Sequence, residues 1–362
     1  MPTTCRARAS TISCSTRPSI TAWKDARGCT KSSTRRSRRQ VRTKMAATVG
    51  LIGLGNAGRP MAQRILGAGF ELTVFDIDNA AVDEAEKQGA RRASTAAAAV
   101  RDFTITLLPS SVEVKQAVLG DNGALSALTS GQTLIDLSGT DPDCARELEE
   151  RLSEKQAIFV GGTIHASGAP AIVIPKGLFS IVIGGAKAKI EPAAKVLNAI
   201  AQTIICLPEP WMPKAFKIAI ILYATTNNII SAEICSWLIA QGADPKLFLK
   251  LLQTTGSQPS AGRMEEFMKR DNNDGGALSN SYKDFRQALN SAAKLEIPMP
   301  LASMANQIQE MGRAAGFKRF NSPAAMGKLY ELLTHVDLSG AITDGKKKAP
   351  SERKPSVVWL ED

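Results

Sequence analysis

Short apolar runs alternate with amphipathic segments over the first part of the chain. Residues 48–52 (TVGLI) are uninterrupted and apolar, and the pattern GLGNAG and a helix-like segment, MAQRILGAG, follow them. Further apolar runs lie at 71–78, 103–111, 132–140, 157–164 and 178–185. Such runs are typical of strands that a parallel sheet buries on both faces. We therefore predict successive βα units in a sheet that extends to about residue 207.

The pattern becomes helical after residue 213. Apolar positions recur with helical spacing at 214–242, 244–255, 278–297, 300–316 and 323–335. Gly242 suits the position after a helix, and Asp244 followed by Pro245 suits the start of the next one. The sequence predicts an α/β fold, a Rossmann-type doubly wound parallel sheet over 46–208, followed by an all-α domain over 209–336. The active site is then expected in the cleft between the domains.

The net positive charge of the chain comes from its first 44 residues. They hold twelve Lys or Arg against one acid, Asp25, an excess that equals the net charge of +11 for the whole chain. The predicted folded part is therefore neutral, and we expect it to bind no nucleic acid. No stretch of about 18 uninterrupted apolar residues occurs, so no membrane span is expected.

Residues 1–44 are rich in Arg, Ser and Thr and are expected to be disordered. This composition fits a transit peptide and would predict a mitochondrial protein. An over-long start is an alternative, since Met45 directly precedes the first strand, and the protein would then be cytoplasmic. The run RRSRR at 35–39 could also act as a nuclear signal. The other end, 337–362, contains KKKAPSERKP and is expected to be a flexible tail.

The chain has little capacity for a metal site. None of its six cysteines forms a CxxC pair, and it has two histidines, His165 and His335. A zinc ribbon, a redox dithiol and a His-rich site are therefore not expected.

The glycine pattern predicts a dinucleotide site. Gly53 would allow a tight turn, Gly55 would let the backbone approach a pyrophosphate, and Gly58 would let the following helix pack on the strand. The helix N-terminus would offer N–H groups to the phosphates. The predicted cofactor contacts in this turn are Gly53, Leu54, Gly55, Asn56, Ala57 and Gly58.

Acidic residues after the second strand favour NAD over NADP. Asp76 ends that strand, 23 residues beyond Gly53, where a carboxylate can accept from the ribose hydroxyls. Five acids and no Lys or Arg lie between Asp76 and Glu86, so a 2′-phosphate would be repelled. An alternative interpretation is that the acid caps the next helix, for which Asp78 is also suited.

The segment GLGNAGRPMAQRI resembles GLGxMGxxMAxNL, the opening of the β-hydroxyacid dehydrogenases, a family that includes 3-hydroxyisobutyrate dehydrogenase, tartronate semialdehyde reductase and smaller relatives of 6-phosphogluconate dehydrogenase. The resemblance covers about residues 47–335. Leu108 and Pro109 match the family's leucine-proline turn. Its DxST motif is matched in part by Asp136-Leu137-Ser138-Gly139, which implies that Ser138 or Thr140 supplies the missing hydroxyl to the cofactor.

The substrate loop of the family, DAPVSGG, is similar to TIHASGAP at 163–170. The match implies that Ser167, Gly168 and Ala169 bind substrate, and an ungapped alignment puts His165 at the serine position. A hydroxyl and adjacent N–H groups there could hold a carboxylate. An ordinary surface turn is the alternative interpretation.

The resemblance also implies a catalytic lysine. The family has AxKxxNN with a glutamate sixteen residues after the lysine, and counting back from Glu233 gives Lys217. Lys214 is then expected to lie at the surface of the helix start. Ile220 and Ile221 replace the two asparagines, and Asn228 lies about 16 Å along the axis, too far to replace them. YKDF resembles the family's KDL and makes Lys283 a cofactor-side candidate.

The resemblance implies an NAD-dependent hydride transfer to or from a small β-hydroxy acid or its semialdehyde, with Lys217 as general acid or base. It also implies a homodimer or homotetramer. Two alternatives stay open: a reductase of another carbonyl or an imine, which the Ile220-Ile221 replacement favours, and a non-catalytic scaffold that binds the cofactor.

Overall fold

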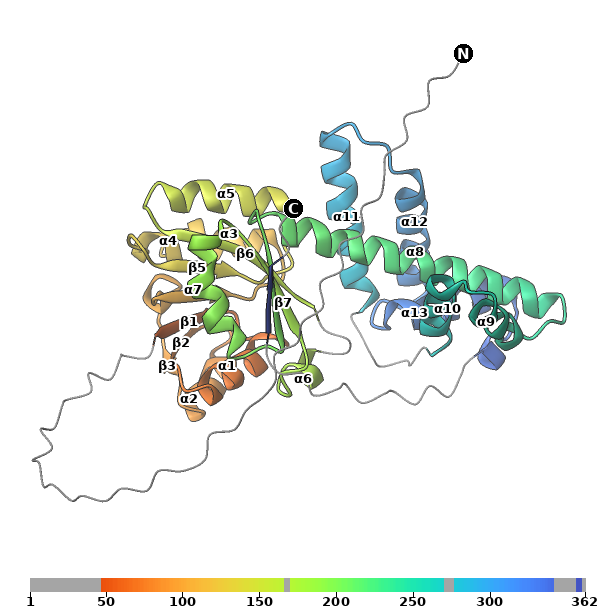
Figure 1. Cartoon of the computed structure of the whole chain (residues 1–362), viewed down its shortest axis with the longest axis horizontal. Helices are drawn as coiled ribbons and strands as arrows, with labels where there is room; N and C mark the ends of the chain where they lie inside the picture. Colours follow the sequence, from red (N-terminus) through yellow and green to blue (C-terminus); the bar gives the residue numbers. More distant parts are fainter. Residues whose placement is uncertain (1–46, 166–169, 270–276, 342–355, 360–362) are drawn as a thin grey trace, which may run out of the picture. The chain divides into compact units, whose positions relative to one another are not determined.

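The computed structural model describes residues 47–165, 170–269, 277–341 and 356–359 (Figure 1). Its first part is one sheet in the order β3-β2-β1-β4-β5-β6-β7-β8-β9. Neighbouring strands are parallel except β6 and β7. The strands are β1 (Thr48–Ile52), β2 (Glu71–Phe75), β3 (Arg91–Arg92), β4 (Phe103–Thr106), β5 (Thr133–Asp136), β6 (Ile158–His165), β7 (Ser180–Gly184), β8 (Thr203–Leu207) and β9 (Ser356–Trp359). The doubly wound sheet reaching residue 207 is confirmed.

Successive residues of the central strands face opposite sides of the sheet, as the two-residue period of a strand requires. In β1, Leu51 packs into one apolar cluster and Ile52 into another. The first cluster is closed by α1 (Gly58–Gly67), α2 (Asn79–Lys87) and α7 (Lys187–Asn198). The second is closed by α3 (Ser111–Leu119), α4 (Ala124–Ala127) and α5 (Pro142–Ser153). Burial on both faces explains why the strands are apolar without interruption.

The prediction of a flexible tail over 337–362 is wrong in two places: Ser339–Ala341 form a short 3-10 helix, with Leu338 and Ala341 buried in the helical part, and a strand forms further on. Residues 356–359 form β9, which pairs in parallel with β8. Val and Trp are residue types that favour strands, and β8 would otherwise leave its backbone groups unpaired at the sheet edge. The remainder of the tail from residue 342 lies outside the described residues.

The second part is helical, as expected. It comprises α8 (Met212–Ala240), α9 (Pro245–Thr254), α10 (Gln258–Met268), α11 (Leu278–Lys294), α12 (Pro300–Ala314) and α13 (Ser322–Thr334). Gly242 has a φ of +82° after α8, and the Asp244 side chain caps α9, as predicted. The sequence analysis missed α10 and the four-residue α6 (Pro170–Val173), since α10 has a weak apolar pattern interrupted by Gly and Pro.

Helix α8 has the length and composition of a membrane-spanning helix, with a mean hydropathy of 1.4 over its most apolar window. Length and composition alone are weak evidence, because a core helix has both. Here α8 packs against α10, α11 and α13, and its buried face carries Thr225, Asn228 and Ser231. Those contacts are typical of a helix at the centre of a bundle.

The segment that leads into α8 crosses the sheet very closely. A Cβ on Gly161 would lie 1.9 Å from the Pro210 carbonyl oxygen, and one on Gly184 would lie 2.0 Å from that of Glu209. Only glycine at both positions allows this approach, because any side chain would overlap backbone atoms. The first turn of α8 is thereby held against β6 and β7, next to the carboxyl end of β5.

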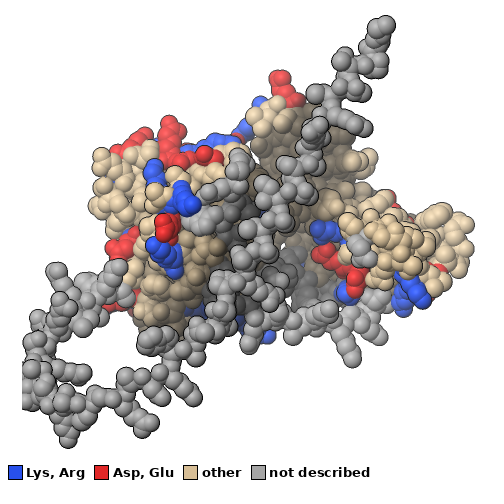
Figure 2. Space-filling model, viewed as in Figure 1, with Lys and Arg blue, Asp and Glu red and all other residues tan. Residues whose placement is uncertain are grey.

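Charged side chains of both signs are interspersed over the described residues on the face drawn in Figure 2. Ion pairs join several charged residues that lie close together in the sequence, as Arg92 does with Asp83 and Glu86. This view matches the neutral charge of residues 45–362 and has no continuous basic surface.

Candidate active site

The three glycines of the turn after β1 have different surroundings, and the fold requires two of them to be glycine. Gly53 has a φ of +103°, and a Cβ there would lie 2.2 Å from the Leu107 carbonyl oxygen. A Cβ on Gly58 would lie 2.0 Å from the carbonyl oxygen of Gly53, so α1 can pack here only on a glycine. Gly55 has no atom within 4 Å of its added Cβ. The space beside Gly55 is therefore open, at the N-terminus of α1, where N–H groups lack helical partners.

Asp76 is joined to this turn directly. Its Oδ2 accepts a short hydrogen bond from the Leu54 N–H, and its Oδ1 accepts from the Asp78 N–H at 2.8 Å. The Asp78 side chain caps α2 by accepting from Ala80 N–H. The capping role thus belongs to Asp78, and Asp76 remains beside the glycine turn.

An arginine from elsewhere in the sequence reaches these acids. Arg59, the residue after Gly58, forms ion pairs with Asp78 at 3.2 Å and Glu84 at 3.3 Å, and its Nε donates to the Leu54 carbonyl. The expectation that the acidic segment has no arginine near it is wrong, because α1 folds back beside α2. The guanidinium is held between two carboxylates.

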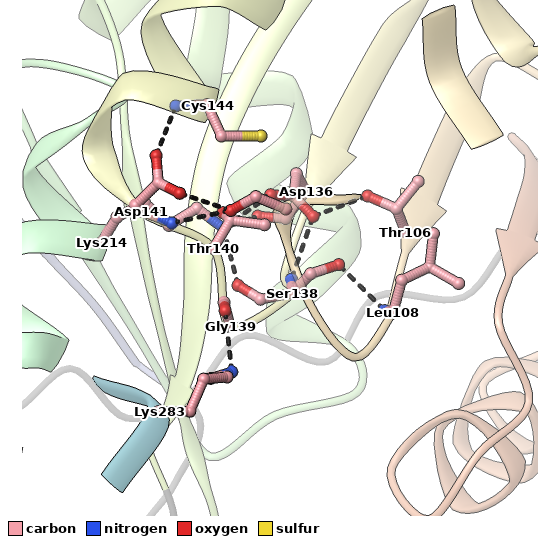
Figure 3. A network of polar contacts seen from close by, with 11 residues as sticks. Thr106, Leu108, Asp136, Ser138, Gly139, Thr140, Asp141, Cys144, Lys214 and Lys283 are labelled. Carbon is pink, nitrogen blue, oxygen red and sulfur yellow. Dashed lines mark hydrogen bonds and ion pairs between the residues drawn. The ribbon is translucent and has the colours of Figure 1, made fainter. Parts of the chain in front are cut away.

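A buried carboxylate organises the loop after β5 (Figure 3). Asp136 is fully buried. Its Oδ1 accepts from the Thr106 hydroxyl at 2.8 Å and from Ser138 N–H at 3.0 Å, and its Oδ2 accepts from the Thr140 hydroxyl at 3.1 Å. Burial alone would raise the pKa of Asp136, but Lys214 and these hydrogen bonds outweigh it and lower the pKa.

Lys214 does not lie at the surface, and the prediction for it is wrong. Its side chain is buried, and Nζ donates to Asp136 Oδ2 at 2.7 Å and to the carbonyl oxygens of Asp136 and Ser138, each at 2.9 Å. No local pattern could predict this pair, because its partners are 78 positions apart. Lys217 lies three positions after Lys214, so both project from one side of α8.

Lys217 and Lys283 converge on Gly139, in the loop after β5. A Cβ added to Gly139 would lie 3.0 Å from Lys283 Nζ and 3.4 Å from Lys217 Nζ. Lys283 donates to the carbonyl oxygen of Gly139 at 3.0 Å (Figure 3). It also donates to that of Pro109 at 3.2 Å. The threonine of the family's DxST motif is absent here, and the ammonium groups come close to the space its side chain would need.

Burial lowers the pKa of Lys217, and the charges of Lys283 and Lys214 lower it further, while Asp284 and Asp136 oppose them. Asp284 is itself buried, which raises its pKa against the opposing effects of Lys217 and Lys283. Sequence reasoning missed Asp284, although it directly follows Lys283 in the YKDF motif. A partly buried amine with a lowered pKa can exchange a proton at moderate pH.

His165 ends β6 on the same side of the sheet. It is half-buried, and burial, together with the charge of Lys217, lowers its pKa. The other predicted substrate residues, Ser167, Gly168 and Ala169, lie outside the described residues.

The remaining predicted cofactor residues line the carboxyl ends of β4 and β5. Leu108 N–H donates to the Ser138 hydroxyl oxygen at 2.9 Å, which ties the two loops together. The Thr140 hydroxyl donates to Asp136, so its proton is directed into the loop. Ser138 and Thr140 are both buried, and they build the loop through these contacts.

The isoleucines at the usual asparagine positions have different environments. Ile220 is half exposed, whereas Ile221 packs against the apolar cluster of the helical part. Asn228 donates to the Ser322 hydroxyl in α13 at 3.2 Å, so it serves the helix bundle and is no substitute for the missing amides.

The residues fit a dinucleotide. The glycine turn leaves open space beside Gly55, the N-terminus of α1 faces that turn, and the carboxyl ends of the parallel strands carry the polar loops. Among the described residues, no three of His, Cys, Asp and Glu gather as metal ligands would.

Family comparisons agree with this arrangement. Residues 48–207 match the NAD-binding domain of 6-phosphogluconate dehydrogenase, and residues 213–329 match the NAD-binding domain of NADP-dependent 3-hydroxyisobutyrate dehydrogenase. The chain is 29% identical to 2-(hydroxymethyl)glutarate dehydrogenase of Eubacterium barkeri over 81% of this chain and 97% of that protein. It is also 29% identical to human mitochondrial 3-hydroxyisobutyrate dehydrogenase over 75% of this chain and 83% of the human protein.

Solved structures share the fold. A 3-hydroxyisobutyrate dehydrogenase of Mycobacterium tuberculosis, solved with L-serine, has a TM-score of 0.68 and 23% identity, and the match covers 79% of this chain and 99% of that one. An imine reductase variant from Myxococcus stipitatus in complex with NAD⁺ has a TM-score of 0.52 and 20% identity, covering 79% and 99%. The chain therefore belongs to the β-hydroxyacid dehydrogenase family, NAD(P)-dependent oxidoreductases that act on the hydroxyl groups of small hydroxy acids.

Proposed function

We propose that the protein is an NAD-dependent dehydrogenase of a small β-hydroxy acid, or a reductase of the matching semialdehyde, with Lys217 as the general acid or base. One observation carries the proposal: a half-buried lysine lies within a few ångströms of Gly139, at the carboxyl edge of the sheet that bears the dinucleotide turn. In open parallel sheets, ligands bind at that edge.

The proton chemistry follows from the surroundings of Lys217. In the oxidative direction the neutral amine accepts the proton of the substrate hydroxyl, and in the reductive direction the ammonium donates to the forming alkoxide. The nicotinamide, when bound, supplies or accepts the hydride. Burial lowers the pKa of Lys217, which increases the fraction of neutral amine available for the oxidative direction.

NAD is the proposed cofactor, on two grounds. Asp76 lies beside the glycine turn, where a carboxylate accepts from ribose hydroxyls and repels a 2′-phosphate. Arg59 is the nearby cation that could bind such a phosphate, but Asp78 and Glu84 already neutralise it. NADP binding would require the guanidinium to leave both partners.

The proposed substrate is small and anionic. Lys217 and Lys283 bring two positive charges to Gly139, and Asp284 offsets one of them. We propose that His165, Ser167, Gly168 and Ala169 contact its carboxylate. Ile220 offers no hydrogen bond where an asparagine is usual. The part of the substrate that faces Ile220 is therefore expected to be less polar than in the relatives.

A homo-oligomer is proposed from the exposed face of α8. Phe216, Ile220, Tyr223, Ile230 and Trp237 are exposed and are spaced by three, four or seven residues, so they form one stripe, here named the α8 stripe. Spacings of three, four and seven follow a seven-residue repeat, which suits packing against another helix. A second copy of this chain is the proposed partner.

We also propose that residues 1–44 direct the protein to mitochondria.

The central test is Lys217→Met in the full-length protein. We expect turnover of 3-hydroxyisobutyrate and similar hydroxy acids with NAD to fall by about 10²–10⁴-fold, the usual contribution of general acid–base catalysis. The affinity of the variant for NAD, measured by titration calorimetry, should stay near that of the wild type. The wild type should bind NADP more weakly than NAD.

Lys246→Met, which alters an exposed lysine of α9, is the matched control and should leave turnover unchanged. Wild-type turnover by Lys217→Met would refute the assignment. Turnover confined to ketones or imines without a carboxylate would favour the alternative reductase.

A further inference from the structure

We infer that Lys214 is a positioning residue, which together with Asp136 locks the first turn of α8 to the loop after β5 and so fixes the Lys217 amine above Gly139. This inference rests on the proposed role of Lys217. It concerns a residue that touches neither substrate nor cofactor and acts through its neighbours.

Every hydrogen-bond donor of the Lys214 ammonium is used in this contact between α8 and the loop. The three N–H groups of the Lys214 ammonium have three acceptors, Asp136 Oδ2, the Asp136 carbonyl and the Ser138 carbonyl, at 2.7 to 2.9 Å. Both side chains of the ion pair are fully buried. Lys214 therefore has no donor left for a ligand, so a direct catalytic role does not fit it.

The lock controls both sides of the Lys217 contact. On one side, Lys217 lies three residues after Lys214 and projects from the same side of α8, so anchoring Lys214 also fixes the rotation of the helix. On the other side, Gly139 lies between Ser138 and Thr140, and Asp136 bonds to both of these residues. Removing the Lys214–Asp136 pair would therefore free both the Lys217 amine and the loop that contains Gly139.

Stability alone does not explain a pair of this kind. Two charges lose their hydration on burial, and replacing a buried ion pair by apolar groups is often neutral or stabilising. The pair here joins residues 78 positions apart, one in the sheet and one at the start of the long helix. A geometric role for the site accounts for its position.

Five charged or titratable groups influence or adjoin Lys217, from four elements. They are Lys214 on α8, Asp136 on β5, His165 on β6, and Lys283 and Asp284 on α11. Lys214 lowers the pKa of Lys217 and Asp136 raises it, with Lys214 the larger of the two. Removal of Lys214 alone must therefore raise the pKa of Lys217, because the Asp136 charge is then left uncompensated.

The experiment compares Lys214→Met, the double variant Lys214→Met/Asp136→Asn and the exposed-lysine control Lys195→Met. For each full-length protein, kcat and KM are measured against pH in the oxidative direction, with melting temperature and NAD binding. For Lys214→Met we expect kcat to fall at least tenfold and its lower pH limb to move to higher pH, because the pKa of Lys217 rises. Lys195→Met should match the wild type.

The double variant separates position from charge. With both charges gone, the pH limb should return close to that of the wild type, whereas kcat stays at least tenfold lower because the loop is no longer tied to α8. If Lys214→Met fails to fold, the double variant alone decides. Wild-type kcat in the double variant, or in a folded Lys214→Met with an unmoved pH limb, would overturn the inference.

The inference and the proposed function can fail separately. Normal turnover by Lys217→Met removes the proposed function, and the inference with it. Lost turnover in Lys217→Met together with wild-type behaviour of the Lys214 variants removes only the inference.

Discussion

At the scale of single residues, the same amino acid serves different physical needs a few positions apart. Gly53 is required by its positive φ, Gly58 by the approach of helix to turn, and Gly55 by neither, since its surroundings in the protein are open. The open space at Gly55 lies at the N-terminus of α1, where a pyrophosphate would bind, so glycine there leaves room for the ligand.

The contrast predicts opposite phenotypes for two alanine variants. Gly55→Ala should keep the melting temperature of the wild type, because its Cβ meets no atom, and should weaken NAD binding by about tenfold or more, because the Cβ obstructs the pyrophosphate. Gly58→Ala should lower the free energy of unfolding by about 1–3 kcal/mol, because its Cβ overlaps a backbone carbonyl.

Thermal unfolding and NAD titration of both variants check this prediction. The explanation would fail if Gly55→Ala were as destabilised as Gly58→Ala, or if it bound NAD as tightly as the wild type.

At the scale of elements, α8 combines three functions along its length. Its start crosses Gly161 and Gly184 of the sheet, its first turns carry Lys214 and Lys217, and its middle is the centre of the helix bundle. Its outer face carries the α8 stripe, whose residues are all exposed, with the Arg263 guanidinium over the ring of Tyr223. An exposed apolar stripe on such a helix marks an interaction surface.

The α8 stripe predicts a defined oligomer. The double variant Ile230→Glu/Trp237→Glu should reduce the mass measured by light scattering to that of a smaller species, because it places charges in an apolar interface. The helical circular dichroism signal should be unchanged, since both residues are exposed. Gln241→Glu, at the exposed end of α8, serves as control, and an unaltered mass for the double variant would rule out this surface.

At the scale of the whole molecule, charge divides the chain sharply. The net charge of +11 belongs to residues 1–44, and the rest is neutral, with acids and bases interspersed on the face drawn in Figure 2. The basic, acid-poor composition of residues 1–44 is the ground on which a transit peptide is proposed.

The leading segment predicts import. Residues 1–44 fused to a fluorescent protein should direct it to mitochondria in eukaryotic cells, and replacing their arginines by glutamine should leave the fusion in the cytosol, because import signals depend on positive charge. Fluorescence microscopy with a mitochondrial dye gives the measurement. Cytosolic fluorescence from the unaltered segment would contradict the mitochondrial proposal.

The sequence by itself determined the architecture and the cofactor class. Uninterrupted apolar runs, a glycine pattern at a strand–helix junction and long helical periodicity depend on neighbours in the chain, so they can be read locally. The same is true of Asp76 and of the helix limits at Gly242 and Asp244. The positions of Lys217 and Lys283 came from the family resemblance, and their roles stay predictions.

Only the tertiary structure decided how the charges pair. The sequence analysis put Lys214 at the surface and left the acids near Asp76 without an arginine, and both expectations were wrong. The pairing of β9 with β8 and the interaction of Asp284 with Lys217 could not be predicted from the sequence either. The physical reason is common to all of them: burial and ion pairing depend on residues brought together from distant segments, and no local pattern records which charge will meet which.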